Sequence, residues 1–203
     1  MTDDAVANSP ALDLLFGRRS TAALAAPGPT ATQVDVLLRA ATTVPDHGAL
    51  RPYRFIVVEG DGRDVFGRAL ADAAVEHRPD LPEAGRDKAY GKAFMAPTQI
   101  LLISSPNPAA KVEVWEQVAT AACTGFAIVL AAHGLGLGAI WKSIAFTQGG
   151  PLADALELTP DEQLLGWVNL GTPTGVPGPR VVPSTAQLAT LLRGDAVEVY
   201  PGS

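Results

Sequence analysis

The stretch VEVWEQVATAACTGFAIVLAAHGLGLGAIWKS, residues 112–143, decides the fold. It predicts a helix over residues 112–133, whose first turn carries Glu113 and Glu116, where carboxylates are favourable against the helix dipole. Residues 118–141 contain no Asp, Glu, Lys or Arg, and a helix that is apolar all round must be covered all round. We therefore expect this helix to be buried, and because its apolar surface also suits an interface between two copies of the chain, we predict a homodimer.

The same uncharged stretch is long enough to span a bilayer, which takes about 20 residues. Gly134, Gly136 and Gly138 interrupt its second half, which favours a buried helix followed by a glycine-rich turn and a strand over residues 137–146. Residues 1–10 carry Asp3 and Asp4 rather than the basic segment and apolar run of an export signal. We therefore predict a protein without a membrane span.

The composition limits the classes of function. The 203 residues are 47% hydrophobic and 18% charged, which suits one core, so we predict a flexible N-terminus over residues 1–10 and one domain over residues 11–203. A net charge of −6 argues against a nucleic-acid partner. The single cysteine, Cys123, fits a reducing cytoplasm and is expected to be a buried structural residue. The three scattered histidines predict no metal site.

The periodicity of apolar residues predicts the other elements. We expect helices over residues 11–16, 30–44, 65–73, 86–95 and 151–156, and strands over residues 53–59, 100–104 and 164–170. The strand at 100–104 is apolar almost throughout and should be buried on both faces. Strands and helices do not alternate regularly, which favours a layered α+β domain. Residues 174–203 are rich in proline and glycine, with one short helix near 184–192, and must lie over a subunit, their own or their partner's.

Two motifs carry charged residues. Arg18-Arg19-Ser20 follows the first helix, and two guanidiniums with a hydroxyl can bind a phosphate. Taken alone, the motif is more typical of a solvated basic helix end. Residues 45–52 form a loop stiffened by two prolines that displays His47 and Arg51. Taken alone, His47 is compatible with an ordinary loop histidine.

A third motif joins Gly134, Gly136 and Gly138 to Trp141-Lys142-Ser143. The glycines let a flat ligand approach the backbone, although they also suit the capped end of a helix. The motif is not the dinucleotide fingerprint of a Rossmann fold, because a helix precedes it and its spacing is G-x-G-x-G. A hydrolase is disfavoured as well, because the sequence lacks G-x-S-x-G.

Together these motifs resemble the nitroreductase family of flavin enzymes, in particular its short bacterial branch. The resemblance runs from about residue 12 to residue 173. It also takes in residues 39–41, Arg51-Pro52-Tyr53-Arg54-Phe55, Ala96-Pro97, Trp115-Glu116-Gln117, residues 166–170 and Gly171-Thr172-Pro173.

The resemblance implies a nitroreductase-like layered fold, with a central mixed or antiparallel sheet, flanking helices and a long helix at a dimer interface. It implies a homodimer with FMN at each of two sites between the subunits. It further implies that NADH or NADPH reduces the flavin and that a nitroaromatic compound, a quinone or a related small acceptor then reoxidises it. Hydride transfer to FMN N5 gives ping-pong kinetics and needs no catalytic side chain.

The resemblance also assigns residues. Arg18, Arg19 and Ser20 would hold the FMN phosphate and ribityl chain, and His47, with Arg51 nearby, would reach the flavin from the partner subunit. Trp141, Lys142 and Ser143 would line the flavin on the first subunit. The nicotinamide nucleotide would contact Ala131, Ala132, His133, Gly134, Leu135 and Gly136.

Three positions depart from the family pattern: Thr43 replaces a basic residue, Tyr53 a tryptophan and Lys142 an arginine. We expect Lys142 or Arg51 to place a cation beside the flavin N1–C2=O edge, where it would raise the reduction potential. Two other hypotheses remain open: a flavin-sequestering protein with little turnover, and an interaction module that binds no flavin.

Overall fold

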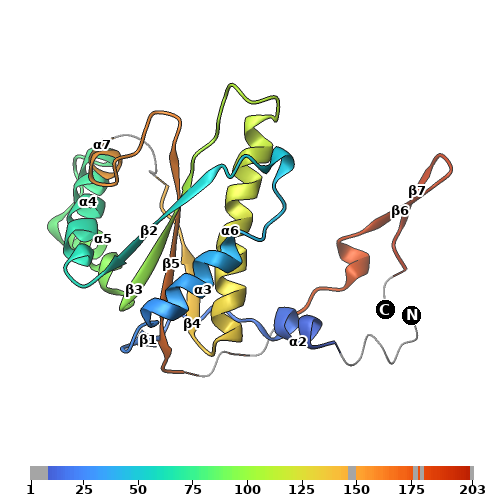
Figure 1. The fold of residues 1–203 in the computed structure, drawn as a ribbon, viewed down its shortest axis with the longest axis horizontal. Coiled ribbons are helices and arrows are strands. Elements are labelled where there is room, and N and C mark those ends of the chain that lie inside the picture. The colour runs from blue at the N-terminus through green and yellow to red at the C-terminus, as the bar shows by residue number, and fades with distance from the viewer. Residues whose placement is uncertain (1–8, 146–149, 176–177, 179–180, 202–203) are drawn as a thin grey trace.

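The computed structural model describes residues 9–145, 150–175, 178 and 181–201. Figure 1 shows a central sheet between two layers of helices, with the C-terminal segment extending away from them. The helical elements are α2 (Pro10–Gly17), α3 (Ala31–Ala41), η1 (His47–Ala49), α4 (Gly62–His77), α5 (Glu83–Gly91), η2 (Lys92–Phe94), α6 (Val114–Gly134), α7 (Gly150–Ala155) and η3 (Thr185–Gln187).

Five strands make the central sheet, and all their pairings are antiparallel. They are β1 (Leu24–Ala25), β2 (Tyr53–Glu59), β3 (Thr98–Ser104), β4 (Gly138–Lys142) and β5 (Gln163–Pro173). The order is β2-β3-β5, and the other side of β5 pairs with β4 and then with β1. All seven residues of β3 are buried, which confirms the prediction for the strand at 100–104.

The sheet separates two apolar clusters. On one side Phe66 and Leu70 of α4 pack against Leu101 and Trp167, and the Phe66 and Trp167 rings meet edge to face with centroids 5.2 Å apart. On the other side Ile128 of α6 packs with other buried residues, among them Leu37, Ile100, Leu102, Val168 and Leu170. The prediction of a layered α+β fold is confirmed.

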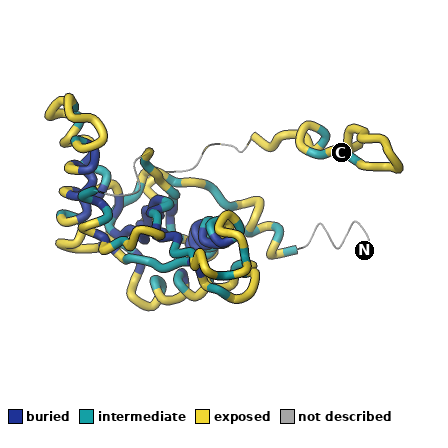
Figure 2. The backbone as a smooth tube through the Cα atoms, turned by 90° about the horizontal axis from the view of Figure 1, so that it is seen from above, coloured by how far each residue is buried: buried dark blue, intermediate teal, exposed yellow. Residues whose placement is uncertain are grey.

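The helix α6 is less buried in the single chain than predicted. One face is buried through Ala121, Ile128 and Ala132, but Trp115 is 69% exposed and Phe126 is 47% exposed. The expectation of a buried Cys123 is wrong for the single chain, in which this residue is exposed. The reason is that the sheet and α3 cover only part of the helix within the described chain (Figure 2). By length and composition α6 is also a candidate membrane span, a test that the core helix of a soluble protein passes as well.

Several element ends also differ. The helix predicted to reach residue 44 ends at Ala41, because the hydroxyls of Thr42 and Thr43 donate to the carbonyls of Arg39 and Ala40. Its predicted N-cap is confirmed, since Thr30 and Gln33 form a capping box. The helix expected at 86–95 divides into α5 and η2, and β4 ends at Lys142 rather than at residue 146, which lies outside the described residues.

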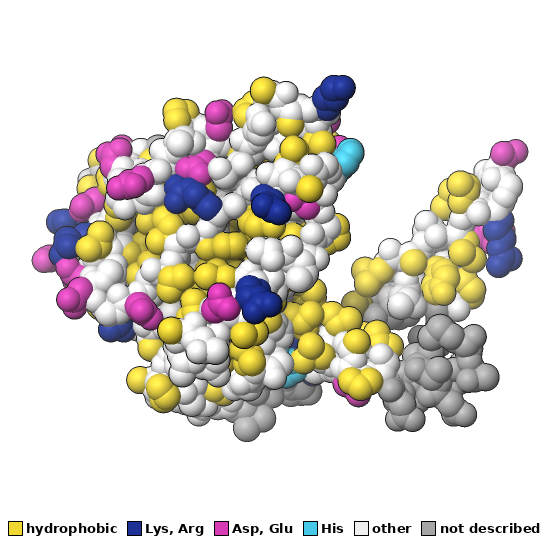
Figure 3. Space-filling model, viewed as in Figure 1, with side chains coloured by type: hydrophobic (Ala, Val, Ile, Leu, Met, Phe, Trp, Pro, Cys, Tyr) yellow, Lys and Arg dark blue, Asp and Glu magenta, His cyan; other side chains and the backbone are white. Residues whose placement is uncertain are grey.

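The C-terminal segment forms a hairpin where a helix was expected. Only Thr185–Gln187 is helical, and β6 (Thr190–Arg193) pairs with β7 (Ala196–Val199). The alternation of Val197, Glu198 and Val199 after the turn residue Gly194 was the signal that the helix prediction overlooked. This segment lies apart from the sheet and exposes hydrophobic side chains, including Val181, Leu188 and Leu192 (Figure 3).

Two glycines determine how β4 packs. Gly166 of β5 has φ +123°, and the position that a Cβ would take there lies 2.1 Å from the Lys142 carbonyl oxygen. On the face of the sheet that α6 covers, the position that a Cβ would take at Gly125 lies 2.7 Å from the ring of Trp141. β4 therefore approaches β5 closely, with Trp141 turned toward α6 and Lys142 on the opposite face, next to Trp167.

A partly buried ion pair fastens the loop before β5 to β2. Arg54 donates from Nε to Glu162 Oε1 at 2.7 Å and from Nη2 to Oε2 at 2.8 Å, and Nη2 also reaches the carbonyl of Glu157. The Glu162 side chain is only 6% exposed. The hydrogen bond from Arg54 lowers the pKa of Glu162 to about 2.

We predict that Gly166→Ala destabilises the fold by more than about 2 kcal/mol, because it adds a clash with Lys142 to an unfavourable φ. Gly60→Ala is the matched control, since Gly60 also has positive φ, +53°, but has no atom within 4 Å of its Cβ position. The control should lose only about 1 kcal/mol. Urea unfolding at equilibrium measures both variants, and equal losses would contradict the close approach of β4.

We predict that Arg54→Met costs roughly 1–3 kcal/mol at neutral pH, because the buried Glu162 carboxylate keeps the backbone N–H of Thr159 but loses its cationic partner. Since the folded-state pKa of Glu162 is depressed, its contribution is complete above the unfolded value of 4.5 and is lost as the pH falls toward about 2. The difference between variant and wild type, measured by urea unfolding, should therefore shrink near about pH 3. Arg86→Met, at an exposed pair with Asp72, is the control; a deficit independent of pH would refute the role of the pair.

Candidate functional site

The chain that leaves α2 runs beside the free edge of β4. The backbone N–H of Thr21 donates to the carbonyl of Ala139 at 2.9 Å. Arg19 turns back on the helix, and its Nη1 donates to the carbonyls of Phe16 at 2.8 Å and Arg18 at 3.1 Å. Arg19 thus caps α2, and Arg18-Arg19-Ser20 flanks the edge of β4.

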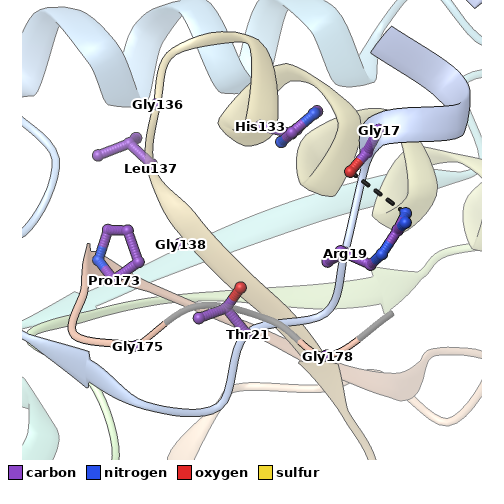
Figure 4. Close-up of a pocket in the computed structure, with 10 residues that line it drawn as sticks. All are labelled: Gly17, Arg19, Thr21, His133, Gly136, Leu137, Gly138, Pro173, Gly175 and Gly178. Carbon is purple, nitrogen blue, oxygen red and sulfur yellow. Dashed lines mark hydrogen bonds between the residues drawn. The ribbon is translucent and has the colours of Figure 1, made fainter. Parts of the chain in front are cut away.

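A first cavity, the terminal cavity, lies where α2 meets the C-terminal end of α6. It has a volume of about 500 Å³. Figure 4 shows Arg19 and His133 on the same side of it, close to Gly17, with Gly138 of β4 on the opposite wall. Its lining is Gly17, Arg19, Thr21, His133, Gly136, Leu137, Gly138, Pro173, Gly175 and Gly178. The structure therefore brings Arg19 together with two of the six residues predicted to contact the nicotinamide nucleotide.

A second cavity, the lysine cavity, lies at the other end of β4. It has a volume of about 400 Å³, and its lining is Lys88, Gly91, Lys92, Met95, Lys142, Ser143, Trp167 and Asn169. Lys142 and Ser143 come from β4 and the residue after it, and α5 and η2 supply the facing wall. The cavity contains two of the three residues that were predicted to line the flavin on the first subunit; the third, Trp141, lies on the other face of β4.

The lysine cavity offers hydrogen-bond donors. The Nε1–H of Trp167 is buried and meets no acceptor among the residues that the structure describes. Asn169 uses its Oδ1 to accept from Gln99 Nε2 at 2.8 Å, which leaves its own NH₂ group available. Burial and the neighbouring Lys88 lower the pKa of Lys92. None of the eight lining residues is acidic, so this cavity suits a ligand with acceptor atoms or negative charge.

The loop at η1 presents the third set of predicted residues. The carboxylate of Asp46 accepts the backbone N–H groups of Leu50 at 3.1 Å and Arg51 at 2.7 Å. These bonds hold three residues in the left-handed region, with φ +78° at Gly48, +53° at Ala49 and +50° at Arg51. Such strain persists where the surroundings over-determine the backbone and is typical of functional loops. The loop exposes His47 and Arg51.

His47 lies beside the N-terminal turn of α6, where its Nδ1 is 3.0 Å from Glu116 Oε2. The terminal cavity includes His133, which lies 17 residues after Glu116 on the same helix. At 1.5 Å per residue, the two positions are roughly 25 Å apart along α6. The structure therefore does not bring His47 and Arg51 together with Arg19 within one chain. Two copies whose α6 helices pack side by side in opposite directions would bring them together.

Sequence reasoning missed six of the eight residues of the lysine cavity, among them the four with nitrogen donors in their side chains: Lys88, Lys92, Trp167 and Asn169. A lysine on a helix is ordinarily solvated, and the two strand residues were counted as core. Sequence reasoning also left out Asp46 and Glu116, although both belong to the quoted motifs. Asp46 fixes the loop at residues 45–52, the His47 loop, and Glu116 contacts His47 itself. Among the described residues, no group of three or more His, Cys, Asp or Glu side chains could hold a metal ion.

Comparison with known proteins agrees with this geometry. The model of the family described as Nitroreductase family matches residues 15–172. The chain is 37% identical over 163 residues to the "Putative NAD(P)H nitroreductase YdjA" of Escherichia coli K12, covering 80% of this chain and 88% of YdjA. A protein of Haemophilus influenzae with the name "Putative NAD(P)H nitroreductase" is 36% identical over the same length.

Solved structures share the fold. A nitroreductase-like protein from Bacillus cereus superposes with a TM-score of 0.80 at 21% identity, covering 96% of this chain and all of that one. A nitroreductase with bound FMN from Bacteroides fragilis gives a TM-score of 0.67 at 19% identity, covering 92% of this chain and all of that one. With a family match over most of its length and two relatives above one-third identity, the chain belongs to the nitroreductase family.

Proposed function

We propose that the protein is an FMN-dependent oxidoreductase that uses NADH or NADPH to reduce nitroaromatic compounds, quinones or related small acceptors. The observation that carries this proposal is the free edge of β4. Arg18-Arg19-Ser20 flanks this edge, and a cavity lined by donors lies where the strand ends. The names of the relatives, NAD(P)H nitroreductases, and the FMN in the Bacteroides fragilis structure support the assignment.

The residues present fit FMN. Its phosphate carries negative charge, which a chain of net charge −6 accommodates only where basic residues gather, and Arg18 with Ser20 offers such a place. Arg19, which caps α2, would hold this turn in shape. The pyrimidine edge of the flavin is rich in acceptors and matches the buried Trp167 N–H, which has no acceptor in the described structure.

We assign the electrostatic role to Lys142 and Lys92. Both line the lysine cavity, so either ammonium can stand beside the flavin N1–C2=O edge and raise the reduction potential. Arg51, on the η1 loop, would take this role only from the partner subunit. FMN supplies the two-electron chemistry when bound, and the protein supplies binding and orientation without a catalytic side chain.

We infer a homodimer with one FMN site at each of two interfaces. Trp115, Phe126 and Val114 leave an apolar surface along α6 that a second copy would cover. The same packing would carry His47 and Arg51 of one chain to the β4 edge of the other. The C-terminal segment, which lies away from its own sheet, would pack over the partner with its exposed Val181 and Leu188 (Figure 1).

The predicted nucleotide contacts extend this proposal. His133 and Gly136 line the terminal cavity beside Arg19, and the remaining four, Ala131, Ala132, Gly134 and Leu135, belong to the same end of α6 and the turn that follows it. We propose that a reduced nicotinamide nucleotide and then the acceptor use one position over the flavin, which gives ping-pong kinetics. A reducing cytoplasm is the compartment that suits this chemistry and the unpaired Cys123.

The absorption spectrum of the purified protein tests the proposal. We predict a band at about 450 nm from oxidised flavin, its bleaching by NADH or NADPH without oxygen, and its recovery when a quinone or nitro compound is added. Parallel double-reciprocal lines should follow from the ping-pong order. A flavin band that neither nucleotide bleaches would favour the sequestering protein instead. A colourless protein that does not take up added FMN would refute both.

A further inference from the structure

A third cavity, the turn cavity, lies beside the turn between α4 and α5. It has a volume of about 320 Å³, and its lining is Ala74, His77, Arg78, Leu81, Gly85, Lys88, Ala89 and Lys92. Lys88 and Lys92 line this cavity and the lysine cavity alike. The two cavities are therefore neighbours, and the side chains of these two lysines stand between them.

The turn cavity is basic in an acidic protein. Four of its eight lining residues are His77, Arg78, Lys88 and Lys92, and none is acidic. Among the described ion pairs, Lys88 and Lys92 take part in none, and Arg78 reaches only the 88% exposed Asp80 at 4.0 Å. On the neighbouring part of α4, Asp72 pairs with Arg86 and Glu76 lies against Gly150. Glu83 and Asp87 of α5 are not among the residues that line the cavity.

The two shared lysines repel each other without a neutralising group. Lys88 stands one helical turn before Lys92, and together with burial it lowers the pKa of Lys92. A bound anion would relieve this repulsion, because an opposite charge within about 4–6 Å favours the charged form of each ammonium. The apolar parts of the lining, Leu81 and Ala74 among them, would exclude water and strengthen that attraction.

We propose that the turn cavity binds the anionic group of a substrate whose planar, reacting part lies over the flavin at the lysine cavity. This inference rests on the proposed function, because it takes the lysine cavity as the flavin site. The group is a phosphate, carboxylate or sulfonate. It comes either from the electron donor, as the additional ribose phosphate that distinguishes NADPH from NADH, or from an acidic substituent of the acceptor.

The two half-reactions separate these sources. Flavin reduction by NADPH and by NADH, followed without oxygen by stopped-flow absorbance, isolates the donor. Reoxidation of the reduced enzyme by para-nitrobenzoate and by the uncharged para-nitrobenzamide isolates the acceptor. The test variants are Lys88→Gln and Arg78→Gln. Arg86→Gln is the matched control, because it removes the same charge from α5 at a residue that pairs with Asp72 and lines neither cavity.

In one of the two half-reactions, Lys88→Gln should lower the second-order rate constant about tenfold for the substrate that carries the additional anionic group, relative to its partner that lacks this group, as loss of a charged hydrogen bond predicts. Arg78→Gln should act on the same pair, added salt should weaken the wild-type preference, and Arg86→Gln should not change it. A change in the NADPH to NADH ratio identifies the donor, and a change in the nitrobenzoate ratio identifies the acceptor. Ratios that stay at the wild-type values in both Lys88→Gln and Arg78→Gln would overturn the proposal.

Equilibrium binding keeps this test independent of turnover. Isothermal titration with NADP⁺, NAD⁺ and para-nitrobenzoate measures the preference for an anion even in a protein that lacks flavin. A yellow, active enzyme with no such preference refutes the turn cavity alone. A colourless protein that still binds an anion through Lys88 refutes the flavin assignment and leaves the anion site in place.

Discussion

The approach of β4 to β5 at Gly166 is the constraint on which the rest of the site depends. Because Gly166 has no side chain, the Lys142 carbonyl lies against its backbone, and the Trp141 ring fits against Gly125 of α6. These contacts turn Trp141 to one face of the sheet and Lys142 to the other. The strand therefore ends with Lys142 and Ser143 at the lysine cavity, and its free edge faces the chain that carries Arg18-Arg19-Ser20.

The helix α6 has two different faces that its composition alone does not separate. One face closes the core through Ile128 and Ala132, whereas the opposite face leaves Trp115 and Phe126 to solvent in the single chain. At its two ends lie the His47 loop and the terminal cavity, roughly 25 Å apart. A dimer built on this helix satisfies both observations, because it covers the apolar face and brings opposite ends of the two helices together.

Much of the fold could be predicted from the sequence because its patterns are local. The β-branched and aromatic run at residues 53–59, the apolar strand at residues 100–104 and the Thr30 cap each specify one structure. The hairpin at β6 and β7 was missed because its alternation is short and lies in a proline-rich tail. The exposure of Cys123 could not be predicted, since an apolar helix does not reveal which of its faces its own chain covers. The lysines of the lysine cavity that come from α5 and η2 were missed, because Lys88 and Lys92 meet Lys142 only when the chain folds and these elements face the end of β4.

The central claim is that each flavin site is shared by two chains, and subunit complementation tests it most directly. One variant carries Arg18→Ala and Ser20→Ala, and the other carries His47→Ala and Arg51→Ala; each alone should bind little FMN. After the two are mixed and their subunits exchange, mixed dimers should contain one intact site each, so FMN binding should recover to about a quarter of the wild-type amount. No recovery after proven exchange would mean that these residues act within one chain, and would contradict the account.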